Sequence, residues 1–196
     1  MNKTNTKDIK EDIINTAMPN IAFDGLNWEM ICNSAEQAGY SKNTAESVFI
    51  HKMKDVLQTI SEITDKNMLE ALEAINPDDL PIRQRIKIAL LERFKYLSQH
   101  RDALTQSMQY WIIPSNKPRA ARIVWQSADT IWSWAGDTSK DYNHYTKRIL
   151  LSGIITATTL YLLNNKECSD ADLEDFIDRR IENVMTIHKF TSRLKN

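Results

Sequence analysis

The segment from Ile149 to Leu163 constrains the fold most, because it is apolar on every side of a helix. A helix of this kind is enclosed by protein instead of lying on a surface. Just before it, Thr138 and Asp141 have the three-residue spacing of a capping box, which predicts a helix that begins near Ser139. We therefore expect a helical domain built around this segment. As a helix the segment is about 22 Å long, shorter than the ~30 Å hydrocarbon core of a membrane, so we expect no membrane span.

The rest of the composition favours an all-helical chain of one or two small domains. Only four Gly and five Pro occur in 196 residues, whereas a sheet would need frequent tight turns. The net charge of −1 provides no bulk attraction to nucleic acid. Cys32 and Cys168 are far apart in sequence and are predicted to be reduced thiols.

No catalytic or metal-binding motif is recognisable. The chain has four histidines, none within a Glu-x-x-His or His-Glu-x-x-His pattern, and no nucleophile elbow or glycine-rich phosphate loop. We therefore predict a protein that is not an enzyme, with no metal site and no cofactor.

Apolar periodicity and capping residues predict the individual helices. They are expected at 8–18, 28–37, 42–49, 51–64, 66–75 and 81–98, then after Asp102, at 119–135, from Ser139 to Leu163, and from Ser169 onward.

The first of these helices have the outline of a helix-turn-helix. Asn27 can cap a helix that ends at a tight Ala38-Gly39-Tyr40-Ser41 turn, and this outline resembles the N-terminal module of the tetracycline-repressor family. A DNA reader needs cationic side chains against the phosphates, but residues 23–50 carry one lysine against four acids. We therefore expect a degenerate module that binds no nucleic acid, with a ligand-responsive transcription repressor as the alternative.

A longer set of residues resembles a second family, the ubiquinone-biosynthesis accessory protein that is ninth in the coenzyme Q series. The resemblance extends from about Asp8 to Lys189. Its most specific part is the Gly-Asp-Thr-Ser-Lys-Asp-Tyr-Asn passage that starts at Gly136, and Ile177-Asp-Arg-Arg-Ile-Glu-Asn-Val-Met185 supports it.

The resemblance implies a tetracycline-repressor-like fold of about nine or ten helices. It also implies an accessory protein that binds an isoprenoid quinone lipid as its ligand and presents it to the di-iron demethoxyubiquinone hydroxylase. The expected location is the cytoplasm at the inner face of a bacterial inner membrane, or the mitochondrial matrix side. We divide the chain accordingly into a helix-turn-helix-like module (1–57), a lipid-binding and dimerisation core (58–167) and an amphipathic membrane-contact helix (168–196).

Clustered aromatic residues are the candidates for the lipid site, although core filling is an equally good interpretation of them. Trp125 and Trp132 are seven residues apart and share one helix face. The predicted lipid-binding residues are Met108, Trp111, Trp125, Ile131 and Trp132.

The helix from Ser139 is expected to have two functional sides. His144, Arg148 and Leu151 share one side, which is interpreted either as a solvated end that runs into a buried helix or as a docking surface. The other side, with Tyr145 and Gly153, is expected to be core or subunit contact in a homodimer. The resemblance implies that His144, Tyr145, Arg148 and Leu151 bind the hydroxylase, with His144 where the family pattern has Trp.

The last helix carries one apolar stripe with a cation in its middle. Such a stripe ordinarily packs on the protein's own core, but a membrane interface would let Arg180 reach lipid phosphates. The resemblance implies that this last helix makes a reversible membrane contact, through Leu173, Phe176, Ile177, Arg180, Ile181 and Val184.

Overall fold

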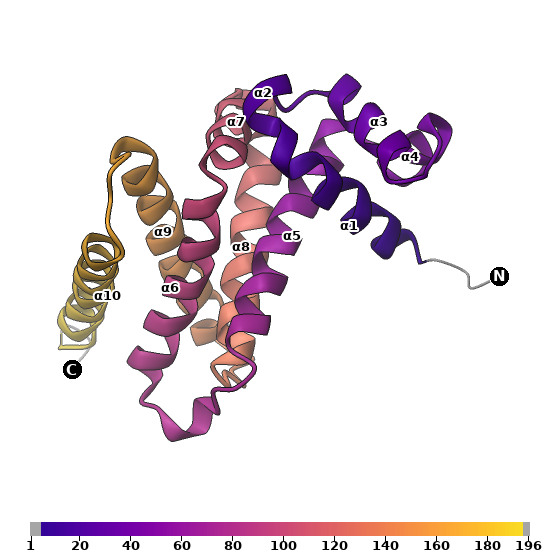
Figure 1. The fold of residues 1–196 in the computed structure, drawn as a ribbon. Helices are drawn as coiled ribbons and strands as arrows, with labels where there is room; N and C mark the ends of the chain where they lie inside the picture. Colours follow the sequence, from indigo (N-terminus) through magenta and orange to yellow (C-terminus); the bar gives the residue numbers. More distant parts are fainter. Residues whose placement is uncertain (1–4, 194–196) are drawn as a thin grey trace. The chain divides into compact units, whose positions relative to one another are not determined.

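The computed structural model describes residues 5–193, and side chains up to Val184. Within these residues the chain is all-helical, with ten α-helices, three short 3-10 turns and no strand (Figure 1). Residues 1–4 and 194–196 lie outside the described part. They belong to the predicted ranges 1–57 and 168–196. Contacts divide the chain into two units, 1–64 with 100–119 and 65–99 with 120–196. This division by contacts differs from the three functional ranges, whose roles stay a prediction.

Unit 1 contains the helix-turn-helix. Its helices are α1 (Thr6–Ala17), α2 (Ile21–Asp24), α3 (Trp28–Gln37), α4 (Lys42–Val48), the first part of α5 (Met53–Ala71) and α7 (Arg101–Trp111). The predicted cap at Asn27 is confirmed, because its side chain accepts from the Met30 amide at 2.9 Å. The Ser41 side chain also caps α4, accepting from the Thr44 amide at 3.1 Å. Gly39 has φ +87° at the end of α3, a conformation that favours glycine, so the turn before α4 forms as expected.

Unit 2 contains the rest of α5, α6 (Ile82–Gln99), most of α8 (Lys117–Trp134), α9 (Tyr142–Asn164) and α10 (Asp170–Arg193). In this unit α10 packs along α6 and α9 (Figure 1). A capping box starts α10, because the Ser169 amide donates to Asp172 at 3.1 Å and the Asp172 amide donates to Ser169 at 3.2 Å.

Two helix boundaries differ from the sequence prediction. The helices expected at 51–64 and 66–75 are one helix, α5, because Asp65 is not a break: it accepts from Arg93 at 2.9 Å and from Ser127 at 2.7 Å inside unit 2. The helix expected from Ser139 begins at Tyr142. Asp141 is its N-cap and accepts from the Asn143 amide at 3.0 Å, so it does not act as the acid of a capping box.

Candidate ligand-binding site

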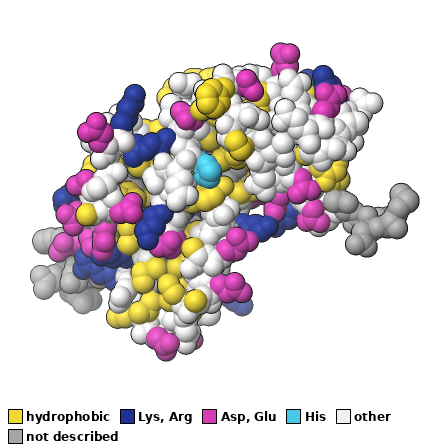
Figure 2. All heavy atoms as spheres, in the orientation of Figure 1, with side chains coloured by type: hydrophobic (Ala, Val, Ile, Leu, Met, Phe, Trp, Pro, Cys, Tyr) yellow, Lys and Arg dark blue, Asp and Glu magenta, His cyan; other side chains and the backbone are white. Residues whose placement is uncertain are grey.

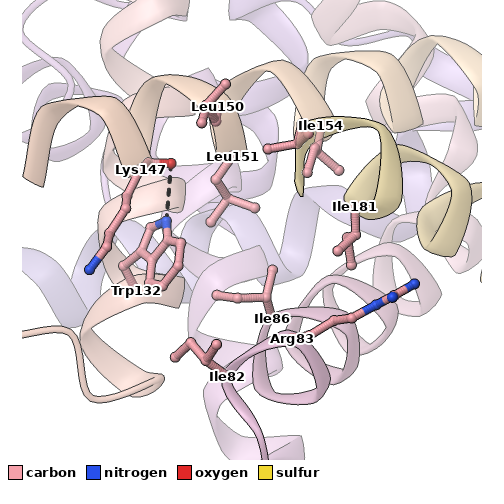
Figure 3. A pocket seen from close by; sticks show the side chains of 10 residues that line it. Ile82, Arg83, Ile86, Trp132, Lys147, Leu150, Leu151, Ile154 and Ile181 are labelled. Atoms are coloured by element: carbon pink, nitrogen blue, oxygen red, sulfur yellow. Dashed lines mark hydrogen bonds between the residues drawn. The ribbon is translucent and has the colours of Figure 1, made fainter. Parts of the chain in front are cut away.

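A cavity of about 220 Å³ lies inside unit 2 (Figure 3). Its wall is almost entirely apolar, and Figure 3 shows the side chains of Trp132, Leu151, Ile86 and Ile181 pointing toward one another around it. Four helices contribute apolar side chains: Ile82 and Ile86 from α6, Trp132 from α8, Leu150, Leu151 and Ile154 from α9, and Ile181 and Val184 from α10. Arg83 and Lys147 complete the lining. Such a wall suits an apolar ligand or part of one.

Trp132 is fixed at one side of the cavity by two contacts with a single residue of α9. Its indole Nε1 donates to the Lys147 carbonyl oxygen at 3.1 Å, and the Lys147 ammonium lies 5.3 Å from the centre of the indole ring (Figure 3). The polar edge of the tryptophan is therefore satisfied while its rings stay available to the cavity.

An ion-pair network holds the start of α9 to the turn that precedes it. Asp137 accepts from Lys147 at 2.6 Å and from Arg148 at 3.0 Å, and Arg148 also donates to Asp129 at 2.5 Å. The side chains of Asp137 and Arg148 are both only 3% exposed. Burial alone would raise the pKa of the Asp137 carboxyl, but the hydrogen bonds from Lys147, Ser139 and Arg148 outweigh it and hold this pKa well below the ordinary value.

The turn between α8 and α9 encloses a second hollow of about 540 Å³, lined by residues 135–139 and by side chains of α6, α8 and α9. Gly136 has φ +83°, and a Cβ atom built there would lie 3.1 Å from the Arg85 guanidinium. Arg85 donates to the Ala135 carbonyl oxygen at 2.8 Å. A glycine at 136 therefore suits both the backbone conformation and the close approach of Arg85.

The five residues predicted to bind lipid lie in different places. Trp132 lines the cavity of unit 2, and Ile131 beside it is completely buried. Trp125 instead contacts α9, with ring centroids 6.5 Å from His144 and 6.1 Å from Tyr145. Met108 and Trp111 are on α7 in unit 1. None of these four lines the cavity of unit 2, and their role in lipid binding stays a prediction.

The two sides of α9 differ from the expectation at some residues and agree with it at others. Arg148 is 3% exposed and Leu151 is 2% exposed, because this side packs into unit 2 and pairs with Asp129 and Asp137. The burial of Leu151 agrees with a side that runs into a buried helix, whereas Arg148 is not solvated as expected for the start of this side. The interpretation of the other side as core is wrong, since its large apolar side chains are exposed: Tyr142, Tyr145, Ile149 and Leu160. Its interpretation as a subunit contact stays a prediction. Of the predicted partner-binding residues, Tyr145 is exposed and His144 is half-buried.

The apolar stripe of α10 is covered by its own unit. Leu173, Ile177 and Ile181 are at most 5% exposed. This burial agrees with the ordinary interpretation of such a stripe, which is that it packs on the protein's own core. Phe176 stacks on Tyr161 with ring centroids 4.1 Å apart, and the Arg180 guanidinium lies 5.1 Å from the Phe176 ring. The buried Nε of Arg180 has no hydrogen-bond partner among the described residues. Val184 lines the cavity.

Ion pairs also join α10 to α6. Lys87 contacts Glu174 at 2.7 Å and Asp178 at 2.5 Å, while Arg83 lies 4.0 Å from Asp178. Figure 2 shows acidic and basic side chains side by side over this part of unit 2. The last helix is therefore docked by an apolar stripe and by a charged rim.

Several residues of the cavity were not candidates from the sequence. Ile82 and Ile86 belong to the helix expected at 81–98, for which no binding role was predicted, and Leu150 and Ile154 fall within the uniformly apolar part of α9. Lys147 and Asp137 were missed as parts of one network. One signal could have indicated them. Asp137 belongs to the Gly-Asp-Thr-Ser motif and Lys147 to the helix that follows it, so charged residues stand next to an apolar helical segment.

The remaining expectations concern nucleic acid, metal and membrane. On the helix-turn-helix, Lys42 lies 3.8 Å from Glu36, so its charge is partly compensated. Among the described residues, no group of His, Cys, Asp and Glu side chains is arranged to hold a metal ion. No described helix combines the length and hydropathy needed to cross a bilayer.

The fold defines the class of protein that this chain resembles. A TetR transcriptional regulator from Nitrosomonas europaea superposes with a TM-score of 0.69 over 90% of this chain and 98% of that one, at 16% sequence identity. The expected tetracycline-repressor-like, all-helical fold is confirmed.

The sequence comparisons find similarity to one family. Residues 117–188 match the COQ9 family model. The chain is 25% identical over 154 residues to the Xenopus laevis mitochondrial ubiquinone biosynthesis protein COQ9-A, 22% over 196 residues to the rat COQ9 protein and 19% over 197 residues to the human one. These alignments cover 79%, 97% and 97% of this chain. The resemblance to the ubiquinone-biosynthesis accessory family is thereby confirmed. The chain spans about half the length of the frog relative and 63% and 62% of the rat and human ones.

Proposed function

We propose that this chain is a non-catalytic accessory protein of ubiquinone biosynthesis that binds an isoprenoid quinone intermediate and presents it to the demethoxyubiquinone hydroxylase. The observation that carries the proposal is the apolar cavity of unit 2, whose α8, α9 and α10 residues lie in the range that matches the COQ9 model. Its volume of about 220 Å³ is below the ~300–1,000 Å³ of most ligand pockets. The cavity therefore suits one part of a long chain.

Filling the cavity is expected to remove the lipid. In Ile154→Trp, a side chain that is 6% exposed and lines the cavity is replaced by a larger one. The bulky indole should take up the space of the ligand, and isoprenoid quinone in organic extracts of the purified protein should fall by about tenfold or more, as measured by mass spectrometry.

The matched control is Ile50→Trp, which makes the same substitution at a side chain that is 75% exposed in unit 1 and does not line the cavity. It should leave the extracted lipid unchanged. Equal lipid in folded Ile154→Trp and in the wild type would show that the ligand does not use this cavity.

The hydroxylase is proposed to contact the exposed start of α9. Tyr145 is 59% exposed and is supported from behind by Trp125 and His144, with ring centroids 6.1 and 5.2 Å away. A rigid, half-covered aromatic side chain of this kind is typical of residues that contribute most to binding. Since Arg148 and Leu151 are buried, they would act by holding α9 in place.

Replacing Tyr145 by Ala is expected to weaken hydroxylase binding by about tenfold or more in a pull-down titration. Tyr142→Ala is the matched control, because Tyr142 is one turn earlier, is 77% exposed, and makes no aromatic contact within the described residues. An unchanged dissociation constant for Tyr145→Ala would contradict the proposed contact.

A second copy of the chain is proposed to cover the rest of this face. Ile149 and Leu160 are exposed, and Gly153 between them has open space around its Cα atom. Small residues allow two helices to approach closely, so α9 suits a symmetric homodimer contact.

We further propose that α10 contacts a membrane reversibly, at the inner face of a bacterial inner membrane or on the matrix side. The mitochondrial names of the relatives support this location.

The alternative function is a ligand-responsive repressor. The charges of the helix-turn-helix do not favour it. Apart from Lys42, which is paired with Glu36, α3 and α4 carry no lysine or arginine. The fold likeness to a TetR regulator concerns the fold alone.

A further inference from the structure

The apolar cavity and the second hollow of unit 2 share part of their walls. Both are lined by Ile82, Trp132 and Lys147. A molecule that fills the cavity can therefore extend past these three side chains into the hollow, provided that it is long enough. A ligand with two chemically different ends would meet two different environments.

The two spaces differ in chemistry. The cavity presents aliphatic side chains of α6, α9 and α10, whereas the hollow presents Arg85, Asp137, Ser139 and the backbone of the α8–α9 turn. Hydrogen-bonding groups in a partly enclosed site orient the polar end of a ligand, and apolar walls bind its remainder.

Lys147 lies in the wall that the apolar cavity and the second hollow share, and one of its ammonium protons has no acceptor among the described residues. Its ammonium carries three protons, and its acceptors within the described residues are two, Asp137 at 2.6 Å and Ser139 at 2.9 Å. The side chain is 38% exposed and lies against the Trp132 ring. The third proton can therefore be donated to an oxygen atom of a ligand in the hollow.

The charges around the hollow compensate one another. The two cations that line it are Arg85, which is paired with Asp78 at 3.3 Å, and Lys147, which is paired with Asp137 at 2.6 Å. Two cations therefore stand against two carboxylates. A phosphate would bring uncompensated negative charge to such a site, whereas a neutral group that accepts hydrogen bonds would not.

We propose that the second hollow holds the neutral, oxygen-bearing ring of the ligand, that the isoprenoid chain next to the ring enters the apolar cavity, and that Lys147 donates a hydrogen bond to a ring oxygen. This assignment rests on the proposed function and adds to it an orientation and a residue that selects the head group. The ring end then lies beside the turn before α9, the helix on which Tyr145 is exposed.

The test compares three probes with the same ten-carbon chain. They are the ubiquinone with two isoprene units, geranyl diphosphate and the hydrocarbon myrcene, each titrated into the full chain by isothermal calorimetry in the same detergent. The wild type should bind the quinone most tightly. Lys147→Met should weaken quinone binding by about tenfold and leave myrcene binding unchanged, because only the ring loses a charged donor. Lys147→Arg should retain most of the affinity.

Lys140→Met is the matched control, because Lys140 is exposed and belongs to neither lining. It should bind all three probes as the wild type does. Equal wild-type affinity for quinone and myrcene would overturn the ring assignment and leave the proposed function standing. Tightest binding of the diphosphate would overturn it in favour of an anionic head group, and no binding of any probe would overturn both proposals. If Lys147→Met fails to fold, the wild-type comparison still decides.

Discussion

Replacing Asp137 by Asn is expected to lower the free energy of unfolding at pH 7 by about 3 kcal/mol. The carboxylate is 3% exposed and accepts charged hydrogen bonds from Lys147 and Arg148. The Arg148 side chain is also 3% exposed. An amide in its place removes the charged acceptor of Lys147 and one of the two carboxylate partners of the buried Arg148 guanidinium, which costs more than the loss of an exposed ion pair. Urea titration of the full chain, followed by circular dichroism, measures the difference.

The same variant has a predicted pH dependence. Because the folded-state pKa of Asp137 is held below its ordinary value, the carboxylate contributes stability at pH values above the unfolded-state pKa. This contribution decreases as the pH falls below about 4. The gap between wild type and Asp137→Asn should therefore be full at pH 7 and should narrow in acid.

Asp79→Asn provides the control, since Asp79 is exposed and its side chain makes no ion pair among the described residues. Its stability should stay within about 0.5 kcal/mol of the wild type at every pH. A gap for Asp137→Asn that stayed constant down to pH 3 would mean that the buried carboxylate is not the source of the stability.

The parts of the fold that depend only on residues close to one another in sequence were predictable. Asn27 caps α3 as expected, because a cap needs only a side chain and an amide two or three positions away. Helix periodicity likewise located α3, α4, α6, α8 and α10 to within a few residues.

The errors arose where a distant residue decides the structure. Asp65 looked like a break between two helices, but Arg93 and Ser127 bind its carboxylate, and both are far away in sequence. Arg148 looked like a surface cation because its partners, Asp129 and Asp137, come together only when the α8–α9 turn closes. Periodicity grouped Arg148 with Leu151 correctly, yet it could not indicate which side of α9 faces the unit.

The cavity was difficult to predict for a related reason. Four helices supply its wall, and each supplies residues that would be ordinary core in a helix that packs closely. Trp132 was a candidate because it belongs to a cluster of aromatic residues in the sequence, whereas Ile82, Ile86 and Ile154 carry no local signal. The space between such side chains depends on helix separation, which a sequence pattern does not encode.

Two substitutions at Ile177 are expected to separate the two interpretations of the α10 stripe. Ile177 is completely buried against its own unit, so both Ile177→Ala and Ile177→Asp should weaken the docking of α10, the first by about 2–4 kcal/mol. Hydrogen exchange of the α10 amides should accelerate in both variants. The proposed membrane contact requires this helix to leave α6 and α9, because Leu173 and Ile181 are buried in the same interface.

The variants should then differ on vesicles that contain anionic lipid. Ile177→Ala keeps an apolar stripe and removes part of the cost of undocking, so its flotation with the vesicles should increase severalfold. Ile177→Asp places a charge in the middle of that stripe, where transfer toward hydrocarbon is costly, so its flotation should fall below that of the alanine variant although its helix is undocked to a similar extent. Equal flotation of the two variants would mean that the stripe serves only the interior of unit 2, and that any membrane contact is made by another surface.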